Sequence, residues 1–423
     1  MVARLVYYWK NVFVPMTFPT TSTDSGQKME LMARSSFSDP GSFFGLMSMC
    51  AAHRAVLESQ RSGVWNKALG DDPYYCMMRA KAFQEMTAMV QDPNRRLSNE
   101  ALDTIINLLT GSLIIGEFSE VHTHLSGLKD MVDQRGGITD DSIRSSSMLS
   151  AIITTDIKAA SGLMTKPVFP LTWDAQPIPS EILRRIRPLA SSALNKIGSG
   201  FSAVTLLSPS LLRILSVLRD MVFFHITCQT NPAALVPSDQ DFFRLLNCEA
   251  EHQLLSYIYA EGFPSPEHRL NPVEAVTRVA SICFLNHFLI VSPPCSGLGR
   301  ALTKHLRMAA GDCELSLLVG LPPQTLELYA WALFVGAQGA LGQPERPWFV
   351  ERLARVAMIC GWQPWEQVSN LMTKFFFADT DSLNWRGIWD EAMTGFVLSE
   401  SEELEFSSLW EQVQSPLPSQ LGT

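Results

Sequence analysis

The feature that most constrains the fold is a stretch of nineteen residues, Ser119 to Gly137, which carries the signals of a complete helix. Ser119 is placed to cap the first turn with its hydroxyl, Glu120 adds negative charge there, and Gly136 ends the element. Apolar side chains recur at helical spacing between these signals, at Val121, Leu125, Leu128 and Val132. We therefore predict one amphipathic helix here.

Similar apolar patterns, bounded by Pro, Asn, Ser or Gly, run through the rest of the chain, and no window alternates as several strands would. The segment 98–115 is apolar on most sides, which is typical of a central helix. Gly116 separates it from the helix at 119–137, so we expect an antiparallel hairpin, with Gly127 allowing close backbone approach. Further helices are predicted at 148–163, 211–227, 241–259, 271–290, 298–310, 326–340, 348–360 and 365–377.

The predicted fold class is all-α, an array of antiparallel helix hairpins that forms one large body over residues 1–395. A chain of 423 residues that is 46% hydrophobic can bury such a core. Its net charge of −9 argues against a main role in coating nucleic acid or an anionic membrane, since both need a basic face. We expect no direct nucleic-acid contact, no membrane association and no transmembrane segment.

The eight cysteines are scattered, and no two stand closer than a dozen residues. This spacing excludes paired C-x-x-C zinc or redox motifs. Because the N-terminus shows no signal-peptide cleavage site, we interpret the cysteines as buried thiols of a protein in a reducing compartment.

Two groups of motifs follow one another in a recognisable order. The first is His124-x-x-Gly127 and Arg135-Gly136-Gly137, followed by a helix with Asp156 and a proline-bounded crossing at Phe169. The second begins with a helix that contains Arg278 and is rich in tryptophan: Leu328-x-x-Trp331, Gly339-Ala340, Arg346-x-Trp348-Phe349, Gly361-Trp362 and Trp365. Together, over roughly residues 5–389, they resemble the helical regulatory domain of fungal Zn2Cys6 transcription factors.

The resemblance implies a transcriptional regulator, located in the nucleus with a cytoplasmic pool, that controls a metabolic gene set. It also implies homo- or heterodimers with other regulators and a small-molecule effector. In that family a six-cysteine zinc cluster lies N-terminal to this domain. Here the resemblance begins within the first ten residues and no cysteine precedes Cys50, so we expect the cluster to be absent. Either the protein works through partners, or the gene model starts too late.

The motif residues are interpreted as structural rather than catalytic. His122 and His124 project about 200° apart on a helix, so they cannot share a metal, and we expect His124 to be packed or to cap a helix. Arg135 complements the carbonyl end of its helix, and the two glycines end it. The structural motif residues are His124, Gly127, Arg135, Gly136, Gly137, Trp331, Gly339, Trp348 and Trp365, and we predict no metal or cofactor.

Catalytic motifs are missing from the sequence: there is no G-x-S-x-G, no phosphate-loop lysine and no H-E-x-x-H. Gly297-x-Gly299 lies in a proline-rich segment that we predict to be a loop, and Asp379 and Asp381 are interpreted as solvating a connection. We therefore predict no enzyme. Two alternatives stay open, an enzyme of a fungal secondary pathway with a tryptophan-lined cavity and a non-catalytic scaffold that dimerises.

Two other side-chain groups have a plain and a functional interpretation. The tryptophans at 331, 348, 362, 365, 385 and 389 fit either a packed core, which we favour, or the walls of an effector pocket. Arg184, Arg185 and Arg187 fit a solvated helix face better than a nuclear signal or a phosphate contact.

The C-terminal segment is acidic. After Arg386 there is no Lys or Arg, and seven Asp or Glu residues give the last 37 residues a charge of −7. Aromatic residues and leucines alternate with the acids, and residues 396–423 are therefore predicted to form a tail that recruits coactivators. The alternative is an ordinary acidic terminal helix.

Overall fold

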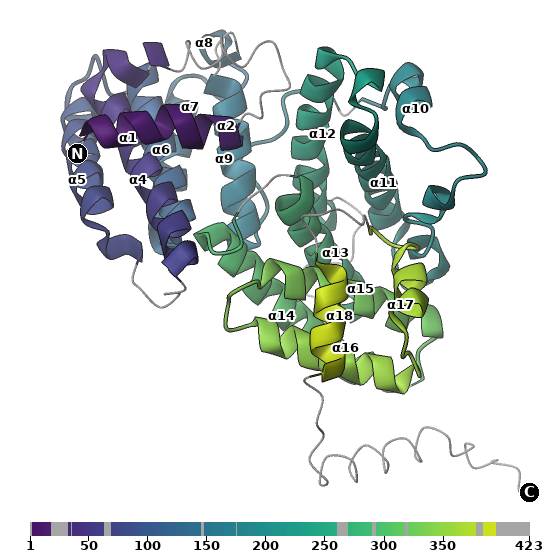
Figure 1. Ribbon diagram of the computed structural model, residues 1–423. Helices are drawn as coiled ribbons and strands as arrows, with labels where there is room; N and C mark the ends of the chain where they lie inside the picture. Colours follow the sequence, from purple (N-terminus) through teal and green to yellow (C-terminus); the bar gives the residue numbers. More distant parts are fainter. Residues whose placement is uncertain are drawn as a thin grey trace, which may run out of the picture.

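The computed structural model describes residues 2–17, 33, 34, 36–62, 69–144, 148–174, 176–259, 270–289, 293–317, 320–377 and 384–394. Within these residues every regular element is a helix, and no strand is present (Figure 1). The all-α prediction is confirmed. The predicted tail at 396–423 and the pair Asp379 and Asp381 lie outside the described residues.

The N-terminal part is built around α6, which packs against α4, α5, α7 and α9. Ser98 caps α6 as predicted, since its hydroxyl accepts a hydrogen bond from the Ala101 N–H at 3.2 Å. The central position that the apolar sequence of α6 predicts is thus confirmed. The elements of this part are α1 (Val2–Tyr8), η1 (Trp9–Phe13), α2 (Val14–Thr17), α4 (Pro40–Ser62), η2 (Leu69–Asp71), α5 (Pro73–Gln91), α6 (Asn99–Ile115), α7 (Phe118–Gln134), α8 (Asp141–Arg144) and α9 (Met148–Leu163).

The C-terminal part is built around α13, α14 and α15, which contact one another, and α16 and α18 cover α15 (Figure 1). Its elements are α10 (Ser180–Ile186), η3 (Ala193–Lys196), η4 (Phe201–Ala203), α11 (Pro209–Thr230), η5 (Pro232–Ala234), α12 (Pro237–Ser256), η6 (Tyr257–Tyr259), α13 (Pro272–Phe284), η7 (Leu285–Leu289), α14 (Gly297–Leu317), α15 (Pro323–Gly339), α16 (Arg346–Ile359), α17 (Trp365–Met372) and α18 (Trp385–Thr394).

Three of the differences between predicted and observed helix ends affect the elements of the C-terminal part. The helix predicted over 271–290 is α-helical only to Phe284 and continues as a π-helix to Leu289. Gly297-x-Gly299 opens α14 instead of lying in a loop, because the Ser296 hydroxyl caps this turn by accepting from the Gly299 N–H at 3.0 Å. The helix that starts at Trp365 ends at Met372 rather than near 377.

A close glycine contact joins the two parts of the chain. Gly116 ends α6 with a φ of 97°, and a side chain on Gly297 would place Cβ only 2.2 Å from the Gly116 nitrogen. The Arg300 guanidinium of α14 donates to the Ile115 carbonyl oxygen at 2.5 Å, which satisfies one of the free carbonyls at the end of α6. The ends of α6 and α14 therefore pack backbone to backbone.

All eight cysteines are free thiols, and half of them fit the prediction of burial. Cys50, Cys283, Cys295 and Cys313 are buried, Cys76 is exposed, and the other three are partly exposed. The prediction was therefore wrong for half of the cysteines, because scattered spacing does not say which helix face a residue occupies.

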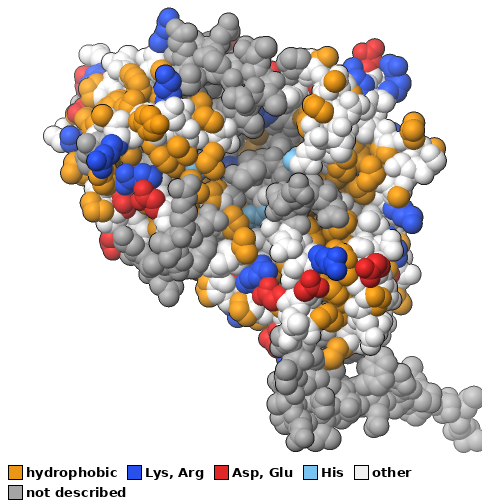
Figure 2. All heavy atoms as spheres, viewed as in Figure 1, with side chains coloured by type: hydrophobic (Ala, Val, Ile, Leu, Met, Phe, Trp, Pro, Cys, Tyr) orange, Lys and Arg blue, Asp and Glu red, His pale blue; other side chains and the backbone are white. Residues whose placement is uncertain are grey.

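The molecular surface lacks a large area of one charge on the face shown in Figure 2. There, Lys and Arg side chains are interspersed with Asp, Glu and hydrophobic side chains. No helix in the described part of the chain is long and apolar enough to cross a membrane.

Candidate functional site

The motif helix α7 begins one residue earlier than predicted. Its N-cap is Glu117, whose side chain makes no capping hydrogen bond, so the prediction that Ser119 caps the helix is wrong. Only Gly116 and Glu117 separate α6 from α7, so the connection between the two helices is two residues long. The Phe118 ring packs against α9, where a Cβ on Gly162 would lie 2.5 Å from its edge. Packing on α9 therefore fixes the start of α7.

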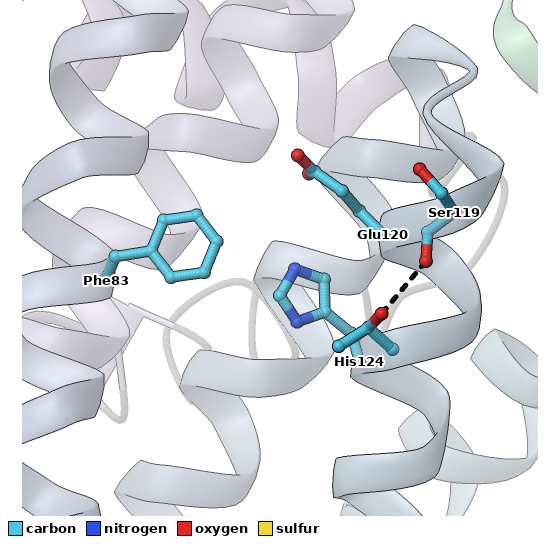
Figure 3. Close-up of a pocket in the computed structure, with 5 residues that line it drawn as sticks. Phe83, Ser119, Glu120 and His124 are labelled. Atoms are coloured by element: carbon cyan, nitrogen blue, oxygen red, sulfur yellow. Dashed lines mark hydrogen bonds between the residues drawn. The ribbon is translucent and has the colours of Figure 1, made fainter.

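His124 is a buried side chain, only 9% exposed, on the face of α7 that meets α5. The centroid of its ring lies 5.5 Å from that of Phe83, and Figure 3 shows the imidazole facing this ring. Nε2 has no hydrogen-bond partner among the described residues, and burial lowers the pKa of the imidazole. His122 is exposed, so the two histidines do not converge on one point.

A shallow pocket of about 230 Å³ lies beside this histidine, lined by Phe83, Ser119, Glu120, Thr123 and His124 (Figure 3). The Glu120 carboxylate is held by Arg79 and accepts a hydrogen bond from the Ser112 hydroxyl at 3.0 Å. Because its charge is already compensated, Glu120 is not positioned as a base for a bound molecule. The pocket offers aromatic and hydroxyl surface but no pair of groups that would perform catalysis.

Replacing His124 with alanine is expected to lower the free energy of unfolding by about 1–2 kcal/mol, because the packing on Phe83 is lost. His124→Leu should instead keep or raise stability, since it removes a buried nitrogen that lacks a partner. Urea unfolding of the two variants measures both effects.

The same pair predicts a pH dependence. Because the folded-state pKa of His124 lies below the unfolded value, the unfolded chain binds more protons, and wild type should lose stability relative to His124→Leu from pH 7 to 5. Unchanged melting of His124→Ala would rule out the packing role.

Two other motif residues of the first group, Gly127 and Arg135, lie where α7 contacts α6. A Cβ on Gly127 would lie 3.1 Å from Cδ1 of Ile105, which shows how closely α7 approaches α6. The Arg135 side chain donates to Asn99 Oδ1 at 2.8 Å and to the Ser142 hydroxyl at 3.0 Å. Arg135 is the C-cap residue of α7, so its charge stands at the carbonyl end of the helix, and its side chain also ties this end to the start of α6 and to α8.

The two motif glycines form the turn after α7. Gly136 and Gly137 have φ values of 104° and 94°, a conformation that favours glycine. The Gly137 N–H donates to the Val132 carbonyl at 3.0 Å, and this hydrogen bond closes the C-terminal turn of the helix.

Trp331 lies at the centre of the C-terminal core and is fully buried. Its ring packs edge-on against Phe201 at 5.1 Å between centroids, and its Nε1 donates to the Phe376 carbonyl at 3.1 Å. Gly339, on the same helix, leaves space for His287, whose Nε2 would lie 2.6 Å from a Cβ at that position. Both motif residues of α15 thus act in helix packing.

The remaining tryptophans of the second group also pack against neighbouring helices. Two guanidinium groups lie over the Trp348 ring, with Cζ of Arg307 5.7 Å and Cζ of Arg352 4.6 Å from its centroid. Trp365 contacts Phe334, with centroids 6.4 Å apart. Trp362, Trp385 and Trp389 are buried. The interpretation as packed aromatic side chains is therefore favoured over the walls of an effector pocket.

A buried polar cluster, which no sequence motif indicated, joins α9, α12 and η7. Lys158 Nζ donates to Glu251 Oε2 at 2.5 Å and to Asn286 Oδ1 at 2.8 Å. The other carboxylate oxygen, Oε1, accepts from the Ser161 hydroxyl at 2.6 Å and from the Asn286 amide at 2.8 Å. The four side chains satisfy one another, so the cluster locks three helices together and offers no free reactive group.

Asp156 holds the crossing that follows α9. Its carboxylate accepts hydrogen bonds from the backbone N–H groups of Val168 and Phe169, at 3.0 and 2.8 Å. Burial raises the pKa of Asp156 to about 6, and the two hydrogen bonds act in the opposite direction. The pairing of Asp156 with the Phe169 crossing in the sequence thus corresponds to a direct contact.

The basic group at the end of α10 is only in part the solvated face that the sequence predicts. Arg185 binds both oxygens of Asp239, at 2.7 and 2.8 Å, and Arg187 binds Asp220 with its Nη2 at 3.0 Å. Arg184 and Arg187 are both exposed, and Arg184 Nη2 lies 3.8 Å from Glu181 Oε1. Two of the three arginines therefore fasten α10 to α11 and α12.

The described residues contain no group of three or more His, Cys, Asp or Glu side chains arranged to hold a metal ion. A second pocket, of about 320 Å³, lies between α12 and the crossing segment around Trp173.

Comparison with known families identifies the chain. The model of the fungal specific transcription factor domain matches residues 4–375, which is most of its length. Searches of curated proteins and of solved structures found no match. Because the match covers both motif groups and all helices from α4 to α16, the chain belongs to the family of the fungal specific transcription factor domain.

Proposed function

We propose that this chain regulates transcription without catalysing a reaction, through a helical regulatory body and an acidic tail that recruits coactivators. Membership in the transcription factor family supports the regulatory role. The pocket beside His124 supports the absence of catalysis, because Glu120 is already bound by Arg79 and Ser112.

The observation that carries the tail proposal is the composition of the C-terminal segment. Its 37 residues after Arg386 hold seven acids and no base. Bulky apolar residues alternate with the acids, at Phe396, Leu398, Leu404, Phe406, Leu409 and Trp410. Acidic neighbours keep such side chains in water until they enter the hydrophobic groove of a partner. This composition therefore suits a segment that docks on a coactivator.

Fusing residues 387–423 to a heterologous DNA-binding domain tests the tail. We expect reporter expression to rise at least about tenfold over the DNA-binding domain alone. A fusion with Phe406, Leu409 and Trp410 all replaced by alanine keeps every acid but should lose most of the gain, because apolar burial supplies the affinity. A fusion that is expressed and nuclear yet gives no gain would reject the tail proposal.

The finer parts of the proposal follow the family. They are control of a metabolic gene set, a nuclear location with a cytoplasmic pool, and a homo- or heterodimer with other regulators. No arrangement of side chains in the described residues specifically favours the alternative of an enzyme with a tryptophan-lined cavity, since Trp331, Trp362 and Trp385 are packed.

A further inference from the structure

We propose that the pocket between α12 and the residues Trp173, Asp174 and Gln176 binds a small organic cation, a protonated amine on an apolar body. The idea that this cation is a regulatory effector rests on the proposed function, whereas the binding of the cation does not. The pocket measures about 320 Å³, which is at the small end of the range for ligand sites. Its lining is Trp173, Asp174, Gln176, Phe242, Leu245, Leu246 and Glu249.

The lining follows from the periodicity of α12. Phe242, Leu245, Leu246 and Glu249 stand at spacings of three and four, so they share one face of the helix. Trp173, Asp174 and Gln176, which lie outside the helices, form the other wall of the pocket. Trp173 Nε1 donates to Glu249 Oε1 at 2.5 Å and thereby fixes the crossing to the helix.

The carboxylate of Glu249 is the group in the pocket that a cationic ligand would bind. The residue is only 6% exposed, yet no Lys, Arg or His among the described residues forms an ion pair with it. Its single hydrogen bond, from the neutral indole of Trp173, uses Oε1, so Oε2 has no partner among the described residues. Oε2 is reached by solvent, and a cation that enters the pocket would pair with a carboxylate that no described basic side chain neutralises.

Burial raises the pKa of Glu249, and the hydrogen bond from Trp173 acts in the opposite direction. A protonated amine in the pocket would supply the missing positive charge next to Oε2.

The walls of the pocket select for positive charge. Asp174, which is exposed, adds a second carboxylate at the entrance, and the lining contains no basic residue. Arg244, the neighbouring base on α12, lies 3.3 Å from Asp241. The rings of Trp173 and Phe242 line the pocket, and an ammonium group placed over either ring would gain a cation–π interaction. Leu245 and Leu246 provide the surface for an apolar body. A carboxylate ligand would be repelled by both acids.

Titration of the full chain with benzylamine by isothermal calorimetry at pH 7 tests the site. We expect a dissociation constant on the order of 0.1–1 mM, which is within the range for a ligand of this size. Benzyl alcohol has the same ring without the charge and should bind at least about tenfold more weakly.

Matched variants locate the binding. Glu249→Gln keeps an oxygen to accept from Trp173 but removes the charge, and it should weaken benzylamine binding at least about tenfold. Asp174→Asn changes an exposed residue and should weaken it two- to threefold, roughly as expected for a solvated charge. Glu366→Gln, an exposed acid on α17, is the control and should bind as wild type does.

Several outcomes would overturn the proposal. One is the absence of any heat of binding up to 10 mM benzylamine, a concentration ~tenfold above the expected range. The others are binding of benzyl alcohol as tight as that of benzylamine, and unchanged benzylamine binding by a folded Glu249→Gln variant. If Glu249→Gln unfolds at a lower temperature than wild type, the Asp174→Asn variant serves as the test instead. Benzylamine binding as tight as in wild type would then contradict the site. Since calorimetry involves no transcription, failure here leaves the tail fusion unaffected, and failure of the fusion leaves the binding result unaffected.

Discussion

Trp331→Ala is expected to lower the free energy of unfolding by about 3–5 kcal/mol, because it empties the centre of the C-terminal core. The indole is fully buried and contacts the rings of Phe201, Phe375 and Phe376, with centroids 5.1 to 6.2 Å apart. Alanine would leave a cavity among these rings and would also remove the hydrogen bond to the Phe376 carbonyl. Urea unfolding followed by circular dichroism measures the loss.

Trp348→Ala is the matched control for this variant. Trp348 belongs to the same motif group but is partly exposed and contacts two guanidinium groups, so its loss should cost only about 1–2 kcal/mol. Equal losses from the two substitutions would show that Trp331 is not the centre of the core.

Glu251→Leu is expected to be the second large effect, with a loss of about 3–5 kcal/mol. The substitution leaves the Lys158 ammonium largely buried without its counter-charge and removes the acceptor of the Ser161 hydroxyl. The affected residues lie on α9 and α12, so the contact between the two parts of the chain should weaken first. Hydrogen exchange of α9 amides and the urea midpoint report the two effects.

The double variant Lys158→Met with Glu251→Leu separates the charge from the packing. It should regain much of the lost stability, because two apolar side chains leave no uncompensated ion behind. Arg355→Met, which breaks the partly exposed pair with Glu351, is the control and should change stability by less than about 1 kcal/mol. A double variant as unstable as Glu251→Leu would contradict this account.

Positions on the motif helix show how local sequence signals can succeed and fail. The stripe of Val121, Leu125, Leu128 and Val132 is buried as its spacing predicts, because each turn of a helix repeats the same face. The helix starts before the predicted cap at Ser119, because the Phe118 ring packs on α9 in the space that Gly162 leaves free. Contacts with distant helices thus decided an end that local signals left open.

The roles of arginines were even less predictable. Arg135 stands at the end of its own helix, as its predicted role requires, but no local signal indicates that it also binds Asn99, 36 residues earlier in the chain. Arg185 and Arg187 looked like a solvated patch, yet each binds a carboxylate on another helix. A long, flexible side chain can reach either solvent or a neighbour, and only the folded neighbour settles which.

The sequence by itself determined the helical class, the central place of α6, the family and the chemistry of the acidic tail, because these depend on periodicity and composition. Tertiary structure alone decided that Lys158, Glu251 and Asn286 meet, and that Glu249 lines a pocket whose lining residues include no Lys, Arg or His. Lys158 and Asn286 are 128 positions apart, so no local pattern could pair them. Burial and charge compensation are properties of neighbours in space, and they exist only once the helices have packed.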